Sequence, residues 1–211
     1  MPESETSREL SAREQKRRRI LRAAIEVFAS KGYFAARMSD VAEAAKVADG
    51  TLYLYFEGKE HLLLSIFDDV LGRFIARLDE EVADVSDPLE KLSLMIRLHL
   101  ETVGRDHDLA HGLQIETRHT RRFMSLFTRG KLGEYLHRVR DNITEGQKLG
   151  VFREDISPGL ATNMVFGTVD ELVTSWLLAD HAGDLLRHHR PLVKMLSDGI
   201  ASPGNHGGEP P

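Results

Sequence analysis

Apolar residues recur along most of the chain at the spacing of three and four residues that is typical of amphipathic helices. No segment shows the strict alternation that predicts a β-strand, and no internal repeat is evident. We therefore predict an all-α fold of about nine helices. Their approximate ranges are residues 12–30, 38–45, 49–55, 59–83, 88–104, 108–127, 132–149, 158–179 and 183–200.

Residues that favour helix ends mark several of these boundaries. Gly32 and Gly150 suit the left-handed position that follows a helix. Asp87 and Ser157 are each followed by proline, so each combines an N-cap side chain with a residue suited to the first helical turn. Asp49 is placed to begin the third helix.

Two short predicted helices, over residues 38–45 and 49–55, are joined by a tight turn. This arrangement is typical of a helix-turn-helix, whose second helix enters the major groove of DNA. The tail reads SPGNHGGEPP, a composition that favours disorder. We therefore expect a flexible N-terminal arm (1–11), a three-helix DNA-binding domain (12–58), a helical ligand-binding and dimerisation domain (59–200), and a disordered tail (201–211).

The predicted recognition helix presents hydrogen-bonding groups on its outer side. Thr51 can contact a base edge or a thymine methyl, and Tyr53 and Tyr55 can donate hydrogen bonds to phosphates. Lys59 opens the next helix, where its charge and the free N–H groups predict an anion site. The apolar residues expected to turn toward the core are Leu52 and Phe56.

The charge is distributed unevenly. The whole chain carries −5, but residues 12–59 hold 10 Lys and Arg against 6 Asp and Glu, a net of +4 that leaves −9 elsewhere. A basic segment on an acidic body indicates that only the N-terminal quarter meets a polyanion, although charge also fluctuates by chance along any chain. The run Lys16-Arg17-Arg18-Arg19 suits phosphate contact or a minor-groove arm; a solvated helix face is the alternative.

The segment GTLYLYFEGKEHLL, preceded by ILRAAIEVFASKGYFAARMSDVAEAAKVADG, resembles the DNA-binding domain of the tetracycline-repressor (TetR) family of bacterial transcription regulators, over about residues 18–64. The resemblance implies a homodimer that binds a palindromic operator through its first three helices and carries a divergent C-terminal ligand domain. The candidate DNA contacts are Arg37, Ser39, Gly50, Thr51, Tyr53, Tyr55 and Lys59.

Two positions depart from the pattern of that family. Arg37 stands where Ser or Thr usually caps the second helix; a guanidinium can pair with phosphate but cannot accept the capping hydrogen bond. Ser39 lies one residue further in than such a cap. Lys46 stands in the turn, where glycine is frequent, and a lysine in a left-handed conformation costs about 1 kcal/mol.

A second resemblance covers about residues 109–178. LQIETRHTRRFMSLF and EYLHRVRDNITEGQKLGVFREDISPGLATNMVFGTVDELVTSWLL are similar to the FadR-type regulators of fatty-acid degradation within the TetR family. This implies release from DNA by a long-chain acyl-CoA. Regulators of aromatic acyl-CoA catabolism and of solvent efflux share part of the pattern, so an aromatic acyl-CoA or another apolar effector is an alternative.

An acyl-CoA requires an apolar tunnel for its chain and cationic groups for its phosphates. Arg118 is the candidate anchor at the pocket mouth, and Arg121 and Arg122 are candidates for the phosphates, because arginine contacts phosphate in a bidentate manner. Core packing and ion pairs of Arg118 with Glu116 and Glu101 are the alternative. The other candidate ligand contacts are Leu98, Leu113, Gln114, Thr117, Phe123, Phe127, Tyr135 and Phe166.

The helix predicted over residues 158–179 is apolar around much of its circumference, which a lone surface helix would not tolerate. We expect it to pair, together with the last helix, with the same helices of a second subunit in a four-helix bundle. Burial within one subunit is the alternative. The candidate interface residues are Phe166, Gly167, Asp170 and Trp176.

Other classes of protein have little support in the sequence. It contains no cysteine, no glycine-rich phosphate loop and no serine-elbow motif, and HDLAH (His107 to His111) lacks the glutamate of a metalloprotease motif. We expect no enzymatic activity, no metal and no cofactor apart from the effector. No apolar run approaches the ~20 residues that span a bilayer, and the N-terminus is not a secretory signal. A cytoplasmic location is expected, and a helical ligand-binding or scaffold protein without DNA binding is the alternative of a different class.

Overall fold

The computed structural model describes residues 3–105, 110, 129–179 and 183–201, with side chains from residue 11 onward. Eight α-helices and one short 3-10 helix account for nearly all of the described residues, which confirms the all-α class. The helices are α1 (Glu3–Lys31), α2 (Met38–Ala44), α3 (Asp49–Tyr53), α4 (Lys59–Val82), α5 (Pro88–Gly104), α8 (Lys131–Lys148), α9 (Pro158–Leu178), η3 (Leu185–His188) and α10 (His189–Ile200).

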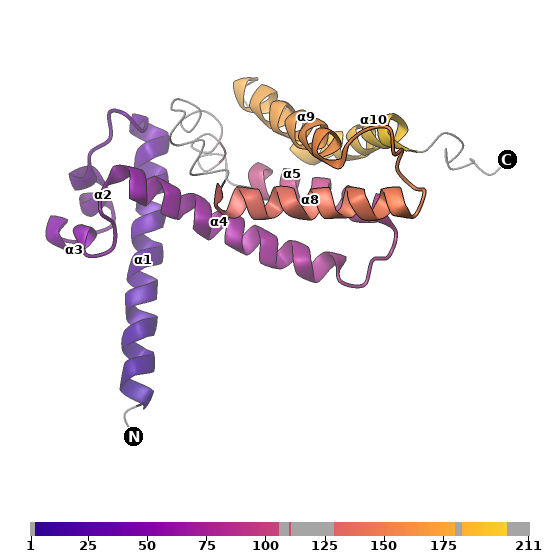
Figure 1. Ribbon diagram of the computed structural model, residues 1–211. Coiled ribbons are helices and arrows are strands. Elements are labelled where there is room, and N and C mark those ends of the chain that lie inside the picture. Colours follow the sequence, from indigo (N-terminus) through magenta and orange to yellow (C-terminus); the bar gives the residue numbers. More distant parts are fainter. Residues whose placement is uncertain (1–2, 106–109, 111–128, 180–182, 202–211) are drawn as a thin grey trace.

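The helices form two groups that α4 connects. α1, α2 and α3 lie together at one end, whereas α5, α8, α9 and α10 pack in a larger group at the other (Figure 1). α4 runs from the first group into the second and contacts α1 as well as α5 and α8. A displacement of α4 would therefore change how the two groups are oriented.

Each group has its own hydrophobic core, and α4 contributes to both. The N-terminal core joins buried residues of α1, α2 and α3 to the first half of α4, up to Val70. The C-terminal core begins on α4 at Phe74 and continues through α5, α8, α9 and α10. The predicted domain boundary between residues 58 and 59 assigned α4 to the C-terminal domain alone, whereas burial divides the helix between the two cores.

The predicted helix ends are confirmed at four positions. Gly32 and Gly150 have left-handed φ values of 76° and 72°. The Asp87 carboxylate accepts hydrogen bonds from two backbone N–H groups of the first turn of α5. Ser157 Oγ accepts one from Leu160 N at 3.3 Å. Local side-chain chemistry therefore decides where these helices begin and end.

Three boundaries differ from the prediction. α1 begins at Glu3, so the expected flexible arm is wrong for residues 3–11, which are helical; glutamates in the first turn favour this start. α3 ends at Tyr53, and Leu54 follows as its C-cap. The last predicted helix divides at His188, because Asp184 caps η3 and Pro191 fits only the first turn of a new helix.

The predicted tail and the predicted sixth helix are described only in part. Ala201, placed in the disordered tail, pairs with Phe152 in an isolated antiparallel bridge. Residues 202–211 lie outside the described residues, as do residues 108–109 and 111–127 of the predicted sixth helix.

Candidate DNA-binding surface and effector cavity

The start of α2 is capped by a residue inside the helix. Arg37 is the N-cap, and its backbone N–H donates to Asp40 Oδ2 at 2.8 Å. Lys31 Nζ donates to the other carboxylate oxygen of Asp40 at 2.9 Å. These bonds, that from Lys31 first, lower the pKa of Asp40. The guanidinium of Arg37 is exposed and takes no part in the cap, as the sequence predicted.

The turn between α2 and α3 contains the strained residue that the sequence predicted. Lys46 has φ 53° and is the one non-glycine residue with positive φ among the described residues. Val47 N donates to Ala42 O at 2.9 Å, which closes the turn. The left-handed conformation costs about 1 kcal/mol, since lysine has a Cβ that glycine lacks.

The recognition helix α3 is buried on one side and open on the other. Leu52 and Phe56 are 0% and 1% exposed, which confirms their place in the core. Tyr53 and Leu54 are 56% and 74% exposed. Of the other candidate DNA contacts, Arg37, Ser39 and Gly50 are exposed, and Thr51, Tyr55 and Lys59 are half-buried.

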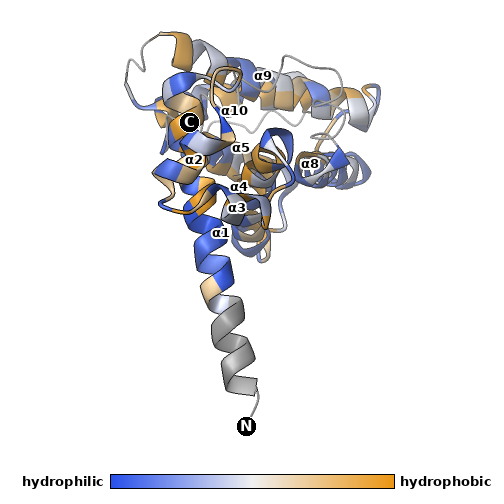
Figure 2. Cartoon of the chain, turned by 90° about the vertical axis from the view of Figure 1, so that its left-hand side faces the viewer, coloured by the Kyte–Doolittle hydropathy of each residue, from blue (hydrophilic) through white to orange (hydrophobic). Residues whose placement is uncertain are grey.

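Two arginines of α1 lie over the aromatic residues that follow α3. The guanidinium carbon of Arg13 is 5.8 Å from the centre of the Tyr55 ring, and that of Arg17 is 5.8 Å from the centre of the Phe56 ring. Figure 2 shows that α1 extends beyond α2 and α3 and that its coloured residues there are mostly hydrophilic. The sequence pointed to the basic run of α1, but it did not show that two cations of α1 lie over the rings that follow the recognition helix.

Lys59 has a role that differs from the predicted phosphate contact. Its Nζ donates to the carbonyl oxygens of Tyr33, Phe34 and Ala36 at 2.6, 3.1 and 2.9 Å. It also lies 4.6 Å from the centre of the Tyr33 ring. An ammonium group has three donors, and all three are used here. Lys59 therefore ties the first residue of α4 to the segment between α1 and α2.

Among the described residues, an apolar cavity of ≈ 80 Å³ lies between α4, α5, α8 and α9. Tyr135 and Phe166, both predicted as ligand contacts, form part of its wall. Leu98, also predicted, is fully buried in the C-terminal core and is not among the wall residues. The wall consists of Val70, Leu71, Phe74, His99, Thr102, Val103, Leu132, Tyr135, Phe166 and Asp170.

One aromatic side chain from each surrounding helix meets at this cavity. The rings of Phe74 and Tyr135 lie edge to face with centres 5.0 Å apart, and His99 lies 6.0 Å from Phe166. His99 Nδ1 and the Tyr135 hydroxyl are 3.4 Å apart, a weak hydrogen bond. The sequence analysis missed His99, although a histidine among the apolar positions of a predicted helix was the available signal.

Burial changes the protonation of this cluster. The surface that His99 retains lies on the cavity wall, and desolvation lowers its pKa to about 4, while the nearby charge of Asp170 acts in the opposite direction. Burial also raises the pKa of Tyr135. Both groups are therefore neutral near pH 7.

The candidate interface residues separate into two kinds. Asp170 and Phe166 lie on the cavity wall, and Trp176 is half-buried against the C-terminal core with Nε1 donating to Gly183 O at 3.0 Å. Gly167 is exposed, and a Cβ added there meets no described atom within 4 Å. The first three residues are half-buried within one subunit, and their contact with a second subunit stays a prediction.

Several predicted ligand contacts lie outside the described residues, among them every candidate arginine. In the described part of the chain, no three His, Asp or Glu side chains gather as they would to bind a metal, and no helix there has the length and apolarity to cross a membrane. Those that the structure does not describe are Leu113, Gln114, Thr117, Arg118, Arg121, Arg122, Phe123 and Phe127.

A helix-turn-helix at one end of α4 and a separate helical core at the other define a DNA-binding transcription regulator. The chain belongs to the TetR family of bacterial transcription regulators. Residues 20–66 match the family described as bacterial regulatory proteins, tetR family, and residues 67–199 match the C-terminal region of YsiA-like proteins. The chain is therefore a DNA-binding regulator and not an enzyme.

Similar proteins extend the match over most of the chain. The fatty acid metabolism regulator protein of Bacillus subtilis is 38% identical over 185 residues, which cover 86% of this chain and 93% of that protein. The crystal structure of FadR from Bacillus subtilis in complex with stearoyl-CoA has a TM-score of 0.83 at 37% identity, covering 86% of this chain and 98% of that one. The structure of the fatty acid degradation regulator FadR from Bacillus halodurans has a TM-score of 0.82 at 34% identity, covering 92% and 97%.

Proposed function

We propose that this protein is a homodimeric repressor that binds a palindromic operator and is released by a long-chain fatty acyl-CoA, so that genes of fatty-acid degradation are controlled by their substrate. The observation that carries the proposal is the apolar cavity against α4, in a chain 37% identical to a regulator solved with stearoyl-CoA.

The size of the cavity supports a change of conformation on binding. Ligand pockets in proteins usually measure about 300–1,000 Å³, whereas the described residues enclose ≈ 80 Å³. We infer that a long acyl chain displaces part of the described wall, which includes Val70, Leu71 and Phe74 of α4. Burying methylenes at ~0.8 kcal/mol each can drive that displacement if the space exists in one state only.

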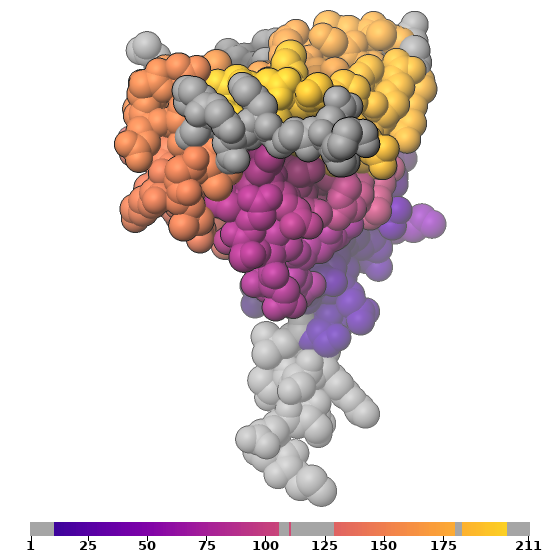
Figure 3. All heavy atoms as spheres, turned by 90° about the vertical axis from the view of Figure 1, so that its right-hand side faces the viewer, coloured from indigo at the N-terminus to yellow at the C-terminus, as the bar shows by residue number. Residues whose placement is uncertain are grey.

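The outer face of α9 and α10 supports the proposed dimer. Leu160 and Met164 on α9 and Met195 on α10 are 54%, 48% and 58% exposed. Figure 3 shows α9 and α10 (orange and yellow) together along one side of the molecule. Gly167 of α9, where an added Cβ meets no described atom within 4 Å, permits close approach of a second helix. Two such pairs of helices form a four-helix bundle.

In the proposed dimer the two recognition helices lie about 34–36 Å apart, so that they enter successive major grooves of the operator. Tyr53 then offers its hydroxyl, and Arg37 its guanidinium, to the phosphates. Movement of α4 in each subunit changes that spacing. An aromatic acyl-CoA or another apolar molecule is the second candidate effector, since the described wall is apolar without being specific for a straight chain.

Operator binding tests the proposal directly. A duplex selected from random sequences is labelled, and its fluorescence anisotropy is followed as protein, salt and ligand are varied. We expect affinity to fall steeply with salt, because counterions are released from DNA. Stearoyl-CoA should release the duplex, whereas free stearate and an aromatic acyl-CoA should do so poorly. Equal release by stearate would show that the CoA phosphates do not contribute to effector binding. Release by the aromatic acyl-CoA alone would favour the second candidate effector.

A conservative variant separates the two sites. Tyr53→Phe removes one exposed hydroxyl, so operator affinity should fall about threefold to tenfold, as for the loss of one hydrogen bond. Affinity for stearoyl-CoA should not change. Tyr135→Phe, on the cavity wall, is the matched control, and this variant should retain the operator affinity of the wild type. A native mass spectrum of the wild type should show a dimer, and a monomer would contradict the proposed subunit arrangement.

A further inference from the structure

α4 changes from one hydrophobic core to the other within a single turn. Val70 is the last of its residues in the N-terminal core, Leu71 already packs against the C-terminal core, and Phe74 is the first residue of α4 that is buried in it. Gly72 lies between them and is the one glycine of this 24-residue helix. The middle of α4 is therefore the place where the packing of its two halves can become independent.

The first half of α4 is held firmly to the DNA-binding group. Lys59 Nζ donates to three carbonyl oxygens of the segment between α1 and α2, at 2.6 to 3.1 Å. Leu62 and Phe67 are 0% and 1% exposed in the N-terminal core. This half of α4 must move together with α1, α2 and α3, because displacing it alone would break these contacts.

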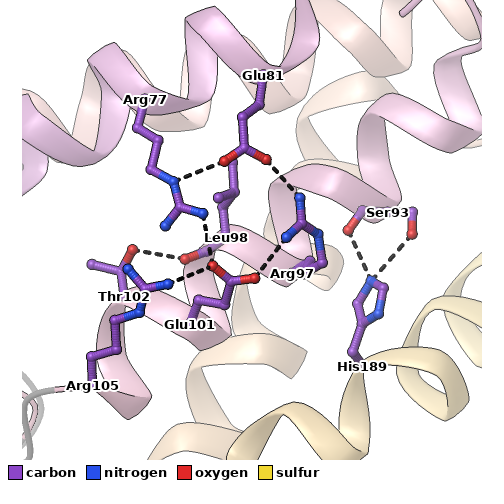
Figure 4. A network of polar contacts seen from close by, with 9 residues as sticks. All are labelled: Arg77, Glu81, Ser93, Arg97, Leu98, Glu101, Thr102, Arg105 and His189. Carbon is purple, nitrogen blue, oxygen red and sulfur yellow. Dashed lines mark hydrogen bonds and ion pairs between the residues drawn. The ribbon is translucent and has the colours of Figure 1, made fainter.

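The second half of α4 is held to α5 by a closed ring of ion pairs (Figure 4). Arg77 bridges Glu81 and Glu101 at 2.8 Å each, and Arg97 bridges the same two carboxylates at 2.6 and 2.7 Å. Each guanidinium uses separate nitrogens for its two partners, which fixes the geometry more tightly than single ion pairs do.

A second clamp joins the same half of α4 to α8. Arg138 donates to both oxygens of the Asp79 carboxylate, at 2.6 and 2.7 Å. Leu78 of α4 is also fully buried in the C-terminal core. The second half of α4 is therefore fixed to the helices that surround the cavity.

Where the two clamped halves meet, α4 lines the cavity. Val70, Leu71 and Phe74, which flank Gly72 on both sides, form part of its wall. A Cβ added at Gly72 would meet no described atom within 4 Å, so close packing does not require a glycine there. A glycine inside a helix lowers its stability relative to alanine. The helix is therefore weakest at the point where the ligand would press on it.

We propose that Gly72 is a hinge of α4, at which the helix bends when a ligand enlarges the cavity, so that the DNA-binding group turns relative to the clamped second half. The inference rests on the proposed function for the identity of the ligand, and it makes Gly72 a positioning residue that contacts neither DNA nor effector. Bending at this point leaves both sets of contacts intact. The ion-pair ring moves with the second half of α4 and with α5, and the Lys59 contacts move with the first half of α4 and with the DNA-binding group.

The test compares Gly72→Ala with Gly159→Ala. Position 159, in the first turn of α9, also has no described atom within 4 Å of an added Cβ, so both variants gain helix propensity without a clash. The first measurement needs no ligand. In the wild type, amide hydrogens at 73–76 should exchange on the order of tenfold faster than those of the two clamped halves. Gly72→Ala should remove that difference, and Gly159→Ala should leave it. Equal protection along the whole of wild-type α4 would refute the hinge.

The second measurement is the coupling factor, the fold-change in operator dissociation constant that saturating stearoyl-CoA produces. In Gly72→Ala this factor should fall on the order of tenfold, with operator affinity in the absence of ligand changed less than about threefold. A coupling factor equal to that of wild type would contradict the hinge even if the repressor function holds. If stearoyl-CoA does not weaken operator binding by the wild type, the effector assignment fails, and hydrogen exchange alone still decides whether Gly72 is a hinge.

Discussion

The two functional regions of this chain present their polar groups in opposite ways. On the DNA-binding group these groups face outward, as for Tyr53, which is 56% exposed. In the larger group they face a cavity, as for Tyr135, which is 2% exposed, and for His99, whose pKa desolvation lowers to about 4. Under the proposed function, DNA recognition depends on side chains that helical spacing places at the surface, whereas effector recognition depends on an internal space that four helices create together.

This difference has a consequence for mutation. A change on the outer face of α3 alters one contact and leaves packing unchanged. A change near the cavity alters packing, because residues such as Phe74 and Tyr135 belong both to the core and to the cavity wall. Under the proposed function it should also alter ligand binding and the position of α4.

The largest loss of stability should come from replacing a glycine that is closely packed in the core of the C-terminal group. A Cβ at Gly146 would lie 2.2 Å from Cδ2 of the buried Phe152 ring, so Gly146→Ala should lower the free energy of unfolding by about 3 kcal/mol through overpacking. Urea unfolding measures this loss. Gly50→Ala is the control on α3, where an added Cβ meets no described atom within 4 Å; it should leave stability nearly unchanged. Similar losses in both variants would remove the contrast between the two regions.

The next effect should appear on acidification. The pKa of His99 is about 4 in the folded protein, below the model-peptide value of 6.5. Between these two pH values the unfolded chain therefore binds a proton at His99 more readily than the folded protein does. The contribution of His99 to the free energy of unfolding is present above pH 6.5 and is lost as pH falls toward 4. The loss should reach about 2–3 kcal/mol.

Replacing the histidine isolates this contribution. His99→Phe should abolish that part of the pH dependence, which urea unfolding at a series of pH values would detect. His137→Phe, at an exposed position of α8, is the comparison. A variant at position 99 that kept the full acid sensitivity of the wild type would show that another group is responsible.

A smaller effect should separate two roles for Lys59. Lys59→Met removes hydrogen bonds to three carbonyl oxygens, so the free energy of unfolding should fall by about 2 kcal/mol and operator affinity should fall with it, while stearoyl-CoA binding is retained. The salt dependence of operator binding should not change, because three carbonyl oxygens already occupy the three donors of this cation. Unaltered stability with a salt slope reduced by about 1 would instead support the phosphate contact expected from the sequence.

The smallest effect should come from the strained turn. Lys46→Gly relieves a left-handed lysine with φ 53°, at the expense of a more flexible unfolded chain, so stability should rise by about 0.5 kcal/mol. Thermal unfolding would show the gain. A decrease in melting temperature would mean that the Lys46 side chain makes a stabilising contact in the turn.

Much of the fold could be read from local signals. Gly32, Asp87 and Ser157 act within a few residues of themselves, so their effect on helix ends does not depend on the rest of the chain. The same holds for Leu52 and Phe56, whose spacing identifies the buried side of the recognition helix. Contacts with a distant segment could not be read in this way, as the hydrogen bonds of Lys59 to the carbonyl oxygens of Tyr33 and Ala36 illustrate.

By itself, the sequence determined the all-α class, the helix-turn-helix with its exposed Tyr53, and the left-handed lysine of the turn, because these follow from periodicity and from backbone preferences of neighbouring residues. Only the tertiary structure decided that Lys59 holds backbone carbonyls, that His99 meets Tyr135, and that one helix belongs to two cores. The physical reason is distance along the chain. Spacing reports which residues share a face of one helix, whereas a cavity or a clamp exists only where faces of several helices come together.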